Sequence, residues 1–335
     1  AFTSLSEVSE VTASGPTRSS VIMKGRVQVD LRIVRPSSFG SALCYFTGSK
    51  SHNIRLRQIA QKLGLKINEY GVFDLRSKKK IAGVKEQDLY KAIDLAYIPP
   101  EMREDRGEIE LAQKNRLPGL VDLTDIKGDL HVHSEKSDGT LSLEEIASAC
   151  MELGYEYVVV SDHSKSLGIA GGLDEKTLFS NAENVRKLNK KLKKIQLLIG
   201  AEVDILNDGT LDYDDGVLKE LDFVIAAIHS GFKQKKEIMT GRVLRALDNK
   251  YVNMFAHPTG RLLGKREAYE IDLEKVLHKA RETNTALEIN AHPERLDLDD
   301  AASRRAKEIG CMIGIATDMH KKDQFHNMAY GVSVA

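Results

Sequence analysis

The sequence has few cysteines and no long apolar segment, and both absences narrow the kind of protein it can be. The three cysteines, Cys44, Cys150 and Cys311, lie far apart in apolar surroundings and form no Cys-x-x-Cys pair. We therefore expect reduced core cysteines and a cytoplasmic protein. No stretch approaches the ~20 apolar residues of a membrane span, and we find no secretory signal.

The chain also lacks net charge, but this balance hides an asymmetry. Residues 1–127 hold 21 Lys and Arg against 15 Asp and Glu, whereas residues 128–335 hold 28 against 34. A basic part joined to an acidic part suits a protein that binds a polyanion with the first and cations with the second. Ordinary scatter of surface charge is the alternative. The length of 335 residues suggests two domains.

The most informative segment is Gly128–Ser134, in which His131 and His133 stand one residue apart on a short apolar run. Side chains alternate along a strand with a period of two, so both imidazoles point to the same side and can reach one metal ion. Asp138 follows in a turn and can add an oxygen ligand. A single His-x-His pair also arises by chance on exposed strands, so it is a weak indication by itself.

The pattern recurs, because seven short apolar runs each lead into residues that can bind metals. In chain order these residues are His131 and His133, Asp162 and His163, Glu202, His229, His257, His292, and Asp318 and His320. Segments between the runs, such as Leu141–Leu153, carry apolar residues at helical spacing. Buried strands alternating with helices predict a parallel α/β sheet, and seven such units predict a closed or nearly closed barrel. Barrels of this kind have their active site at the carboxyl ends of the strands.

Each histidine also has a simpler interpretation, because a single buried histidine is more often a core residue than a ligand. However, nine of the ten histidines follow residue 127, and seven of these end or follow a predicted strand. Chance placement explains this distribution poorly. His278, inside a predicted helix, and His326, in a polar tail, are expected at the surface. His292 could support the ligands or contact a substrate.

Several of these segments resemble the motifs of the PHP (polymerase and histidinol phosphatase) family. They are Asp129–His133, Ser137–Gly139, Ser161–His163, Ala256–Pro258 and Asp318–His320. The resemblance covers about residues 125–335 and implies a distorted seven-stranded (β/α) barrel with a three-metal cluster. It implies nine metal ligands: His131, His133, Asp138, His163, Glu202, His229, His257, Asp318 and His320. Catalysis is expected from four of them, with Glu202 bridging the metals: Glu202, His131, His133 and Asp318.

The donor types indicate the chemistry. Clustered histidines and carboxylates suit Zn²⁺ or Mn²⁺ and fit Mg²⁺ alone poorly. Two or three close ions activate a water and orient it at phosphorus, so we expect phosphoester hydrolysis. A substrate phosphate then needs cations near the metals. Arg261, Lys165 and Arg295 follow ligand segments on strand-end loops and are predicted for this role, with a loop salt bridge as the alternative for each.

The first part of the chain predicts a β-hairpin from Ser19–Met23 and Val27–Val34, followed by helices. One face of the hairpin is expected to hold Val27, Val29, Leu31 and Ile33. Asp30 and Arg32 share the other face, as a surface salt pair or as a metal-binding carboxylate beside an organising cation. The next segment, residues 38–53, starts helical and breaks at Thr47–Ser49.

This part resembles the palm and thumb of family X DNA polymerases. The resemblance lies in Val29–Arg32, Tyr45–Ser49, Asn53, Asn68–Tyr70 and Ile98–Glu104. It implies that Asp30 is one of three catalytic carboxylates that hold two Mg²⁺ ions. It also implies nucleotide contacts from the same module: Asp30, Arg32, Tyr45, Phe46, Gly48 and Asn53. The other two carboxylates belong to an Asp-x-Asp strand that is missing upstream of Asp30, so we expect that this chain cannot polymerise DNA.

Together the two parts resemble the bacterial and archaeal PolX family, in which a family X polymerase precedes a PHP domain. We expect a palm and thumb fragment at residues 1–98, a linker strapped along the barrel at 99–127 and the PHP barrel at 128–335. The resemblance implies 3′-to-5′ exonuclease activity and 3′-end processing in base-excision repair, with DNA as partner and a monomeric chain. A small-molecule phosphatase of the histidinol phosphate type and a non-catalytic DNA-binding scaffold are the alternatives.

Overall fold

The computed structural model describes all 335 residues. The chain divides into two compact units, Ala1–Gly119 and Leu120–Ala335. No helix in either unit has both the length and the apolar character needed to cross a membrane. The domain limits predicted at residues 98 and 128 stay a prediction.

The first unit begins with a small antiparallel sheet of strands β1 (Val8–Ser14), β2 (Arg18–Met23) and β3 (Gln28–Arg32). The predicted hairpin is β2–β3, and it places Val21 opposite Val29. The third strand, β1, was not anticipated. The apolar face predicted for the second strand of the hairpin is largely exposed, because Val27 and Ile33 are each 59% exposed, whereas Val21 on β2 is buried.

The rest of the first unit packs helices against a second three-stranded sheet. These elements are α1 (Phe39–Thr47), α2 (Lys50–Lys62), β4 (Leu65–Asn68), β5 (Gly71–Asp74), β6 (Lys80–Ala82), α3 (Glu86–Ala92) and α4 (Glu108–Gln113). Their core includes Leu56, Ala60, Val72 and Leu89. The helices predicted after the hairpin begin with α1 and α2, and the break predicted at Thr47–Ser49 separates them.

The predicted strap along the barrel is wrong for residues 100–113, which pack in the first unit. Ile109 and Ala112 on α4 belong to the core of that unit. Arg103 is fully buried and its Nη1 donates to Glu86 at 2.6 Å. The dense charge of this segment favoured a linker along the barrel, but a buried ion pair of this kind needs surrounding structure to offset its desolvation.

The second unit is built on a seven-stranded parallel sheet whose spatial order follows the chain. Its strands are β7 (Gly128–Val132), β8 (Tyr157–Val160), β9 (Gln196–Asp204), β10 (Phe223–Ala227), β11 (Met254–Phe255), β12 (Ala286–Asn290) and β13 (Ile313–Ala316). The first and last strands meet as well, because His133 N–H donates to the carbonyl of Met319 at 2.9 Å. The predicted seven-stranded barrel is therefore confirmed.

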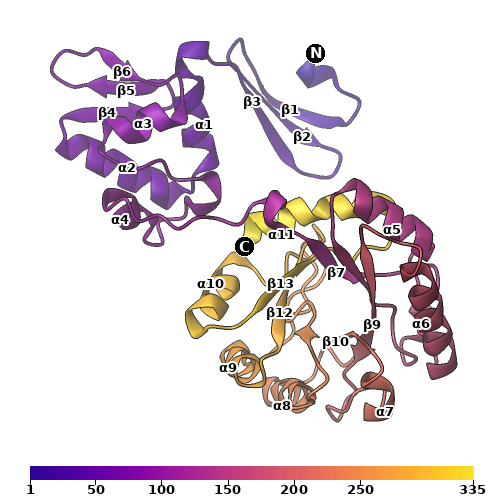
Figure 1. Cartoon of the computed structure of the whole chain (residues 1–335). Coiled ribbons are helices and arrows are strands. Elements are labelled where there is room, and N and C mark those ends of the chain that lie inside the picture. The colour runs from indigo at the N-terminus through magenta and orange to yellow at the C-terminus, as the bar shows by residue number, and fades with distance from the viewer. The chain divides into compact units, whose positions relative to one another are not determined.

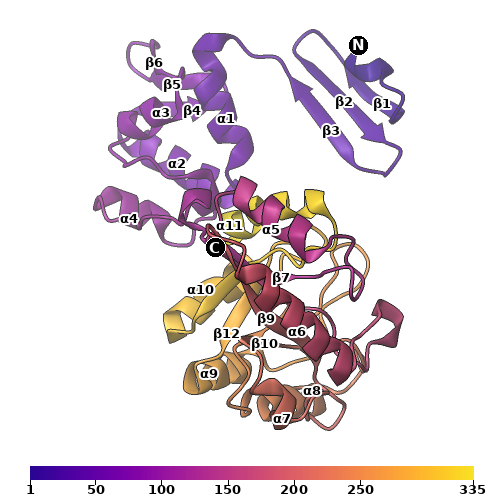
Figure 2. The same ribbon diagram turned by 45° about the vertical axis from the view of Figure 1, so that its right-hand side comes forward.

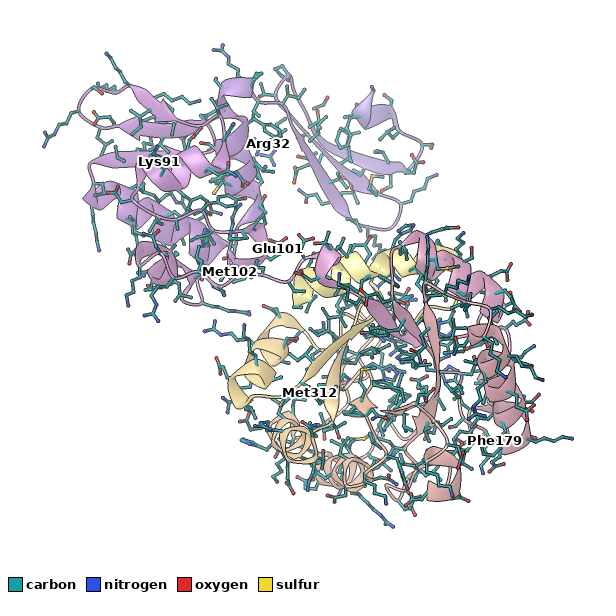
Figure 3. The ribbon with its side chains drawn as sticks, viewed as in Figure 1. Arg32, Lys91, Glu101, Met102, Phe179 and Met312 are labelled. Carbon is teal, nitrogen blue, oxygen red and sulfur yellow. The ribbon has the colours of Figure 1, made fainter.

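Helices cover the outside of this barrel (Figures 1 and 2). They are α5 (Leu143–Glu152), α6 (Glu175–Asn189), α7 (Asp215–Leu218), α8 (Lys236–Leu247), α9 (Leu273–Thr283), α10 (Asp300–Ile309) and α11 (Met328–Val334). Side chains cap several of their first turns, as when Ser142 accepts from Glu145 N–H at the start of α5. Residues on the outer surface, such as Phe179 on α6 and Met312 before β13, stay partly exposed (Figure 3).

The strands are apolar on both faces because both faces are buried. On β10, Val224 and Ala226 pack in the largest cluster, beside residues of α8 and α9. Ile225 and Ala227 pack in a separate small cluster with Met254 of β11. This two-sided burial explains why the strands appear in the sequence as continuous apolar runs without alternation. Because both faces of the strands are buried, the polar residues are found mainly at the strand ends.

Candidate metal centre

The nine predicted ligands come from six strands or the loops that follow them, and the structure brings all nine together. His131 lies on β7 and Glu202 on β9, while the others follow the carboxyl ends of β7, β8, β10, β11 and β13. Eight of them form three groups of donors that could each hold a metal ion, and the ninth, His257, lies 2.8 Å from Glu202 outside these groups. The groups are His133, Asp138, His163 and His320; His131, His133 and Asp318; and His163, Glu202 and His229.

Glu202 lies at the centre of this arrangement. Its Oε2 is 2.7 Å from Nδ1 of His163, 3.5 Å from Nε2 of His131 and 3.7 Å from Nε2 of His133. Its Oε1 is 2.8 Å from Nε2 of His257 and 3.3 Å from Nε2 of His229. The carboxylate is 1% exposed. One buried carboxylate facing five imidazoles is the geometry expected of a group that bridges metal ions.

Asp138 and Asp318 contact the sixth histidine, His320, or histidines that also face Glu202. Asp138 lies 3.3 Å from Nε2 of His320 and 3.5 Å from Nε2 of His163. Asp318 lies 3.2 Å from Nε2 of His133. The ring of His133 stacks between those of His163 and His320, at centroid distances of 4.4 and 4.3 Å. His133 therefore belongs to two of the three donor groups.

The electrostatics of the cluster show strongly coupled charges. Burial alone lowers the pKa of His163, but the Glu202 and Asp138 carboxylates raise it to about 10. Burial and the neighbouring His163 charge lower the pKa of His133 to about 4. Burial raises the pKa of Glu202, but the surrounding imidazolium charges hold it well below its usual range. Such shifts are typical of functional sites.

Unpaired buried atoms show that the donors fit divalent cations. Both ring nitrogens of His133, Nε2 of His131, Nδ1 of His257 and Oε2 of Glu202 are buried without a hydrogen-bond partner. Native proteins rarely leave such atoms unsatisfied, because each costs free energy. Imidazole nitrogens and carboxylate oxygens are ligands for first-row divalent ions, so bound ions would satisfy these atoms together.

Two of the candidate ligands have a backbone conformation that is uncommon for residues with side chains. The φ angles are +29° for His257 and +53° for Asp318. Such conformations cost of order 1–3 kcal/mol each and persist only where the surroundings enforce them. Their position among the donors indicates that the backbone is held there to aim these side chains.

The three predicted phosphate-binding cations have different surroundings. Arg295 Nε lies 3.4 Å from Oδ2 of Asp318, so this residue is at the cluster. Arg261 instead donates to the carbonyls of Arg295 and Leu296 and to Asp299. Lys165 pairs with Glu175 at 2.6 Å. Arg261 and Lys165 thus form the loop salt bridges that were the alternative to a phosphate-binding role.

Support for the ligands comes from polar residues that the sequence pattern did not single out. Nδ1 of His131 lies 2.7 Å from Glu288, and Nδ1 of His229 lies 2.5 Å from Asp204. Asn290 donates to Asp318 at 3.0 Å. Metal-binding histidines commonly donate their other ring N–H to a carboxylate. Asp204 and Glu288 are acidic residues within the otherwise apolar strands β9 and β12. Their presence there was the sequence feature that could have indicated these supporting contacts.

His292 lies beside the cluster on the loop after β12. Its backbone N–H donates to Asn290, and its Nδ1 accepts from the N–H of Glu294 at 3.3 Å. Burial lowers its pKa. The two roles predicted for His292, support of the ligands and contact with a substrate, stay predictions.

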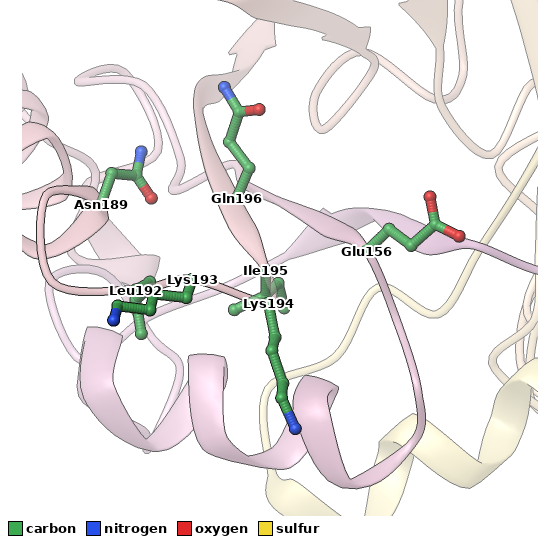
Figure 4. A pocket seen from close by; sticks show the side chains of 7 residues that line it. All are labelled: Glu156, Asn189, Leu192, Lys193, Lys194, Ile195 and Gln196. Carbon is green, nitrogen blue, oxygen red and sulfur yellow. The ribbon is translucent and has the colours of Figure 1, made fainter.

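A hollow in this unit lies where β8 and β9 begin (Figure 4). It is lined by Glu156, Asn189, Leu192, Lys193, Lys194, Ile195 and Gln196. These residues surround the start of β9, whereas Glu202 lies toward the end of the same strand. The hollow is therefore separate from the candidate metal centre.

Comparisons with known proteins agree with the division of the chain into a polymerase-like first part and a PHP-like second part. A family model of the DNA polymerase beta thumb matches residues 42–104, and the PHP domain model matches residues 129–292. The chain is 44% identical over 333 residues to "DNA polymerase/3'-5' exonuclease PolX" of Bacillus subtilis (strain 168), covering 99% of this chain and 58% of that protein. It is also 30% identical over 203 residues to "Probable phosphatase Teth514_1060" of Thermoanaerobacter sp. (strain X514), of which it covers 78%.

The chain belongs to the PHP family. It spans a little under three fifths of the length of the Bacillus subtilis PolX that it matches. Among solved structures, histidinol phosphate phosphatase from Lactococcus lactis, whose crystals contained zinc, L-histidinol and phosphate, aligns with a TM-score of 0.46 and 20% identity. That alignment covers 62% of this chain and 92% of that one.

The residues that resemble those of family X polymerases lie in the first unit, and the three donor groups all lie in the second unit. Asp30 accepts from Ser20 and, at 3.0 Å, from Gln28, and Arg32 lies over the Phe46 ring. Asn53 donates to the carbonyls of Tyr45, Gly48 and Ser49, each at 3.1 Å. Its amide N–H groups therefore hold the turn between α1 and α2, in which Gly48 ends the first helix.

Proposed function

We propose that the PHP domain of this chain hydrolyses phosphodiesters at DNA 3′ ends, as a 3′-to-5′ exonuclease that processes damaged ends in base-excision repair. The observation that carries the proposal is the position of the buried Glu202 carboxylate between five histidines in a cluster of nine donors. The proposed ligands are those nine residues, and the proposed ions are Mn²⁺, Zn²⁺ or both. The name of the Bacillus subtilis relative supports this activity.

The nine donors would hold the ions, which would supply an activated water and stabilisation of the oxygen that leaves phosphorus. The protein holds the donors in place through the barrel strands and excludes bulk water by burying Glu202, His131 and His133. Arg295, whose side chain is 18% exposed beside Asp318, is the proposed contact for the substrate phosphate. Its planar guanidinium can donate two N–H groups to one phosphate.

DNA is the proposed partner because a thumb model matches the first unit and because the first 98 residues hold 16 basic against 8 acidic residues. The positive charge favours a polyanion. A monomeric chain in the cytoplasm is part of the same proposal. Mg²⁺ is the metal proposed for polymerisation by the family X relatives, whereas this chain, with Asp30 alone, is expected to extend no primer.

The test is hydrolysis of a 5′-labelled single-stranded oligonucleotide with Mn²⁺, beside the double variant His131→Ala, His133→Ala and a histidinol phosphate control. We expect stepwise shortening from the 3′ end by the original chain and none by the variant. Turnover of histidinol phosphate alone would favour a small-molecule phosphatase, the function named for the Thermoanaerobacter relative. Primer extension by the same preparation with all four nucleotides would contradict the expected loss of polymerisation.

A further inference from the structure

We propose that Glu288 is a positioning residue of the metal centre, whose carboxylate fixes the ring of His131 and the backbone of His257. The proposal rests on the metal-dependent function proposed above. Glu288 is itself outside the nine candidate ligands and reaches the cluster only through them. It joins ligands from two different strands, β7 and β11, to the strand β12 on which it lies.

The contacts of Glu288 use both carboxylate oxygens. Oε1 lies 2.7 Å from Nδ1 of His131, and Oε2 accepts the backbone N–H of His257 at 2.6 Å. Oε2 also accepts from Nδ2 of Asn290 at 3.1 Å, and the same amide donates to Asp318 at 3.0 Å. Glu288, His131 and Asn290 are fully buried, so water cannot replace these bonds.

The contact with His131 determines which ring nitrogen is free. A neutral imidazole has one N–H and one lone pair, and a carboxylate beside Nδ1 places the N–H there. Nε2 then keeps its lone pair, and this atom faces the cluster, 3.5 Å from Glu202 and 3.7 Å from Asp318. Nε2 has no hydrogen-bond partner, as a metal-binding atom requires.

The contact with His257 acts on the backbone. His257 has the left-handed φ of +29°, and a histidine needs an external contact to remain there. The N–H bond to Glu288 supplies one. With the backbone held in this way, Nε2 of His257 lies 2.8 Å from Oε1 of Glu202.

Glu288→Gln tests the role because it keeps the shape and removes one acceptor. All three partners of Glu288 present N–H groups, so the glutamine NH₂ must face at least one of them. If it faces His131, the ring can accept only at Nδ1, which places the proton on Nε2 and blocks that atom. We expect affinity for Zn²⁺ and Mn²⁺, measured by competition with a chelating dye, to fall roughly 10- to 100-fold.

Glu108→Gln is the matched control. Glu108 in the first unit is also buried, lies 2.7 Å from Nδ1 of a histidine, His52, and accepts backbone N–H groups from Asp105 and Arg106. We expect this variant to keep the metal affinity of the original chain. The visible absorption of the Co²⁺-loaded protein gives a second readout, since it reports ligand geometry and we expect it to change in Glu288→Gln alone. Glu288→Asp, which keeps a carboxylate, is expected to recover part of the affinity.

Affinity within twofold of the original chain and an unchanged Co²⁺ spectrum in Glu288→Gln would overturn the proposal. If neither variant folds, the test is the ¹⁵N spectrum of the original chain, labelled at histidine and loaded with Zn²⁺. A proton on Nδ1 of His131 supports the positioning role, and a proton on Nε2 contradicts it. These readouts do not depend on hydrolysis. Failure of the original chain to cleave DNA would therefore contradict the proposed function and leave the test of Glu288 intact.

Discussion

Nδ1 of His163 lies 2.7 Å from Oε2 of Glu202, and both side chains are almost completely buried. The other oxygen of the same carboxylate lies 2.8 Å from Nε2 of His257. Since these histidines follow β8 and β11, one carboxylate on β9 connects ligands from opposite sides of its own strand in the sheet. Glu202 therefore faces five of the six candidate histidine ligands.

Replacement of Glu202 by glutamine should abolish most of the hydrolytic activity. We expect the initial rate on a single-stranded oligonucleotide to fall at least about 100-fold, or ~2.7 kcal/mol in activation free energy. The amide carries no charge and offers one acceptor where the carboxylate offers two. Glu183→Gln on exposed α6 is the control, because Glu183 contacts only the exposed Lys187 in an ion pair. A Glu202→Gln variant with half of the original rate would contradict the bridging role.

Removal of metal should lower both activity and stability. Ions that bind the folded state alone stabilise it by about 2.7 kcal/mol at a free concentration 100 times the dissociation constant. For a domain of this size we expect a melting temperature roughly 5–10 °C higher with metal than after dialysis against a chelator. Differential scanning calorimetry measures the shift. The variant His131→Ala, His133→Ala should show little of it, and an equal shift in that variant would place the bound metal elsewhere.

Substitution of Arg295 and of Arg261 should have different effects, on substrate binding for Arg295 and on stability for Arg261. Arg295→Ala should raise KM for a phosphodiester about tenfold with little change in melting temperature, because its guanidinium is at the cluster and pairs only weakly with Asp318. Arg261→Ala should mainly lower the melting temperature, since the side chain donates to the carbonyls of Arg295 and Leu296. Steady-state kinetics and thermal unfolding of both variants test this. The opposite pattern would make Arg261 the phosphate ligand.

Acid should destabilise the first unit through Glu108. Burial raises the pKa of Glu108, but the bonds from His52 and from backbone N–H groups outweigh burial and leave it below 4.5. A carboxyl group with a depressed pKa in the folded state stabilises that state above its unfolded pKa, and this contribution is lost as pH falls through the folded pKa. We expect the stability of the original chain to decrease below pH ~4.5. Urea unfolding at several pH values, with Glu108→Gln for comparison, measures this, and equal pH dependence of the two proteins would contradict it.

The repeated unit of an apolar run ending in a histidine or carboxylate made the barrel predictable. Buried parallel strands are apolar on both faces, so the runs are visible in the sequence without knowledge of their partners. Parallel strands also point their carboxyl ends to one side. Residues as distant in sequence as His131 and Asp318 could therefore be predicted to converge, and their donor atoms lie 3.7 Å apart.

Other features could not be predicted, because they depend on which strands become neighbours. Glu288 and Asp204 gain their roles from facing His131 and His229 across the sheet, and no local spacing encodes this contact. The packing of residues 100–113 could not be predicted either, because their charge density indicates a linker. In the structure Arg103 and Glu86 pair in the interior of the first unit. Arg261 and Arg295 occupy similar loops in the sequence, yet only Arg295 lies at the cluster.

The sequence by itself determined the barrel class, the number of its strands and the donor types at their ends, because strand periodicity and ligand chemistry are properties of short segments. The tertiary structure alone decided which side chains contact the candidate ligands, such as Glu288 and Asp204. It also decided that Arg295 lies beside the cluster and that residues up to Gly119 pack in the first unit. Those features arise from contacts between segments up to 157 residues apart, as between His131 and Glu288, and the position of such contacts is set by packing of the whole barrel.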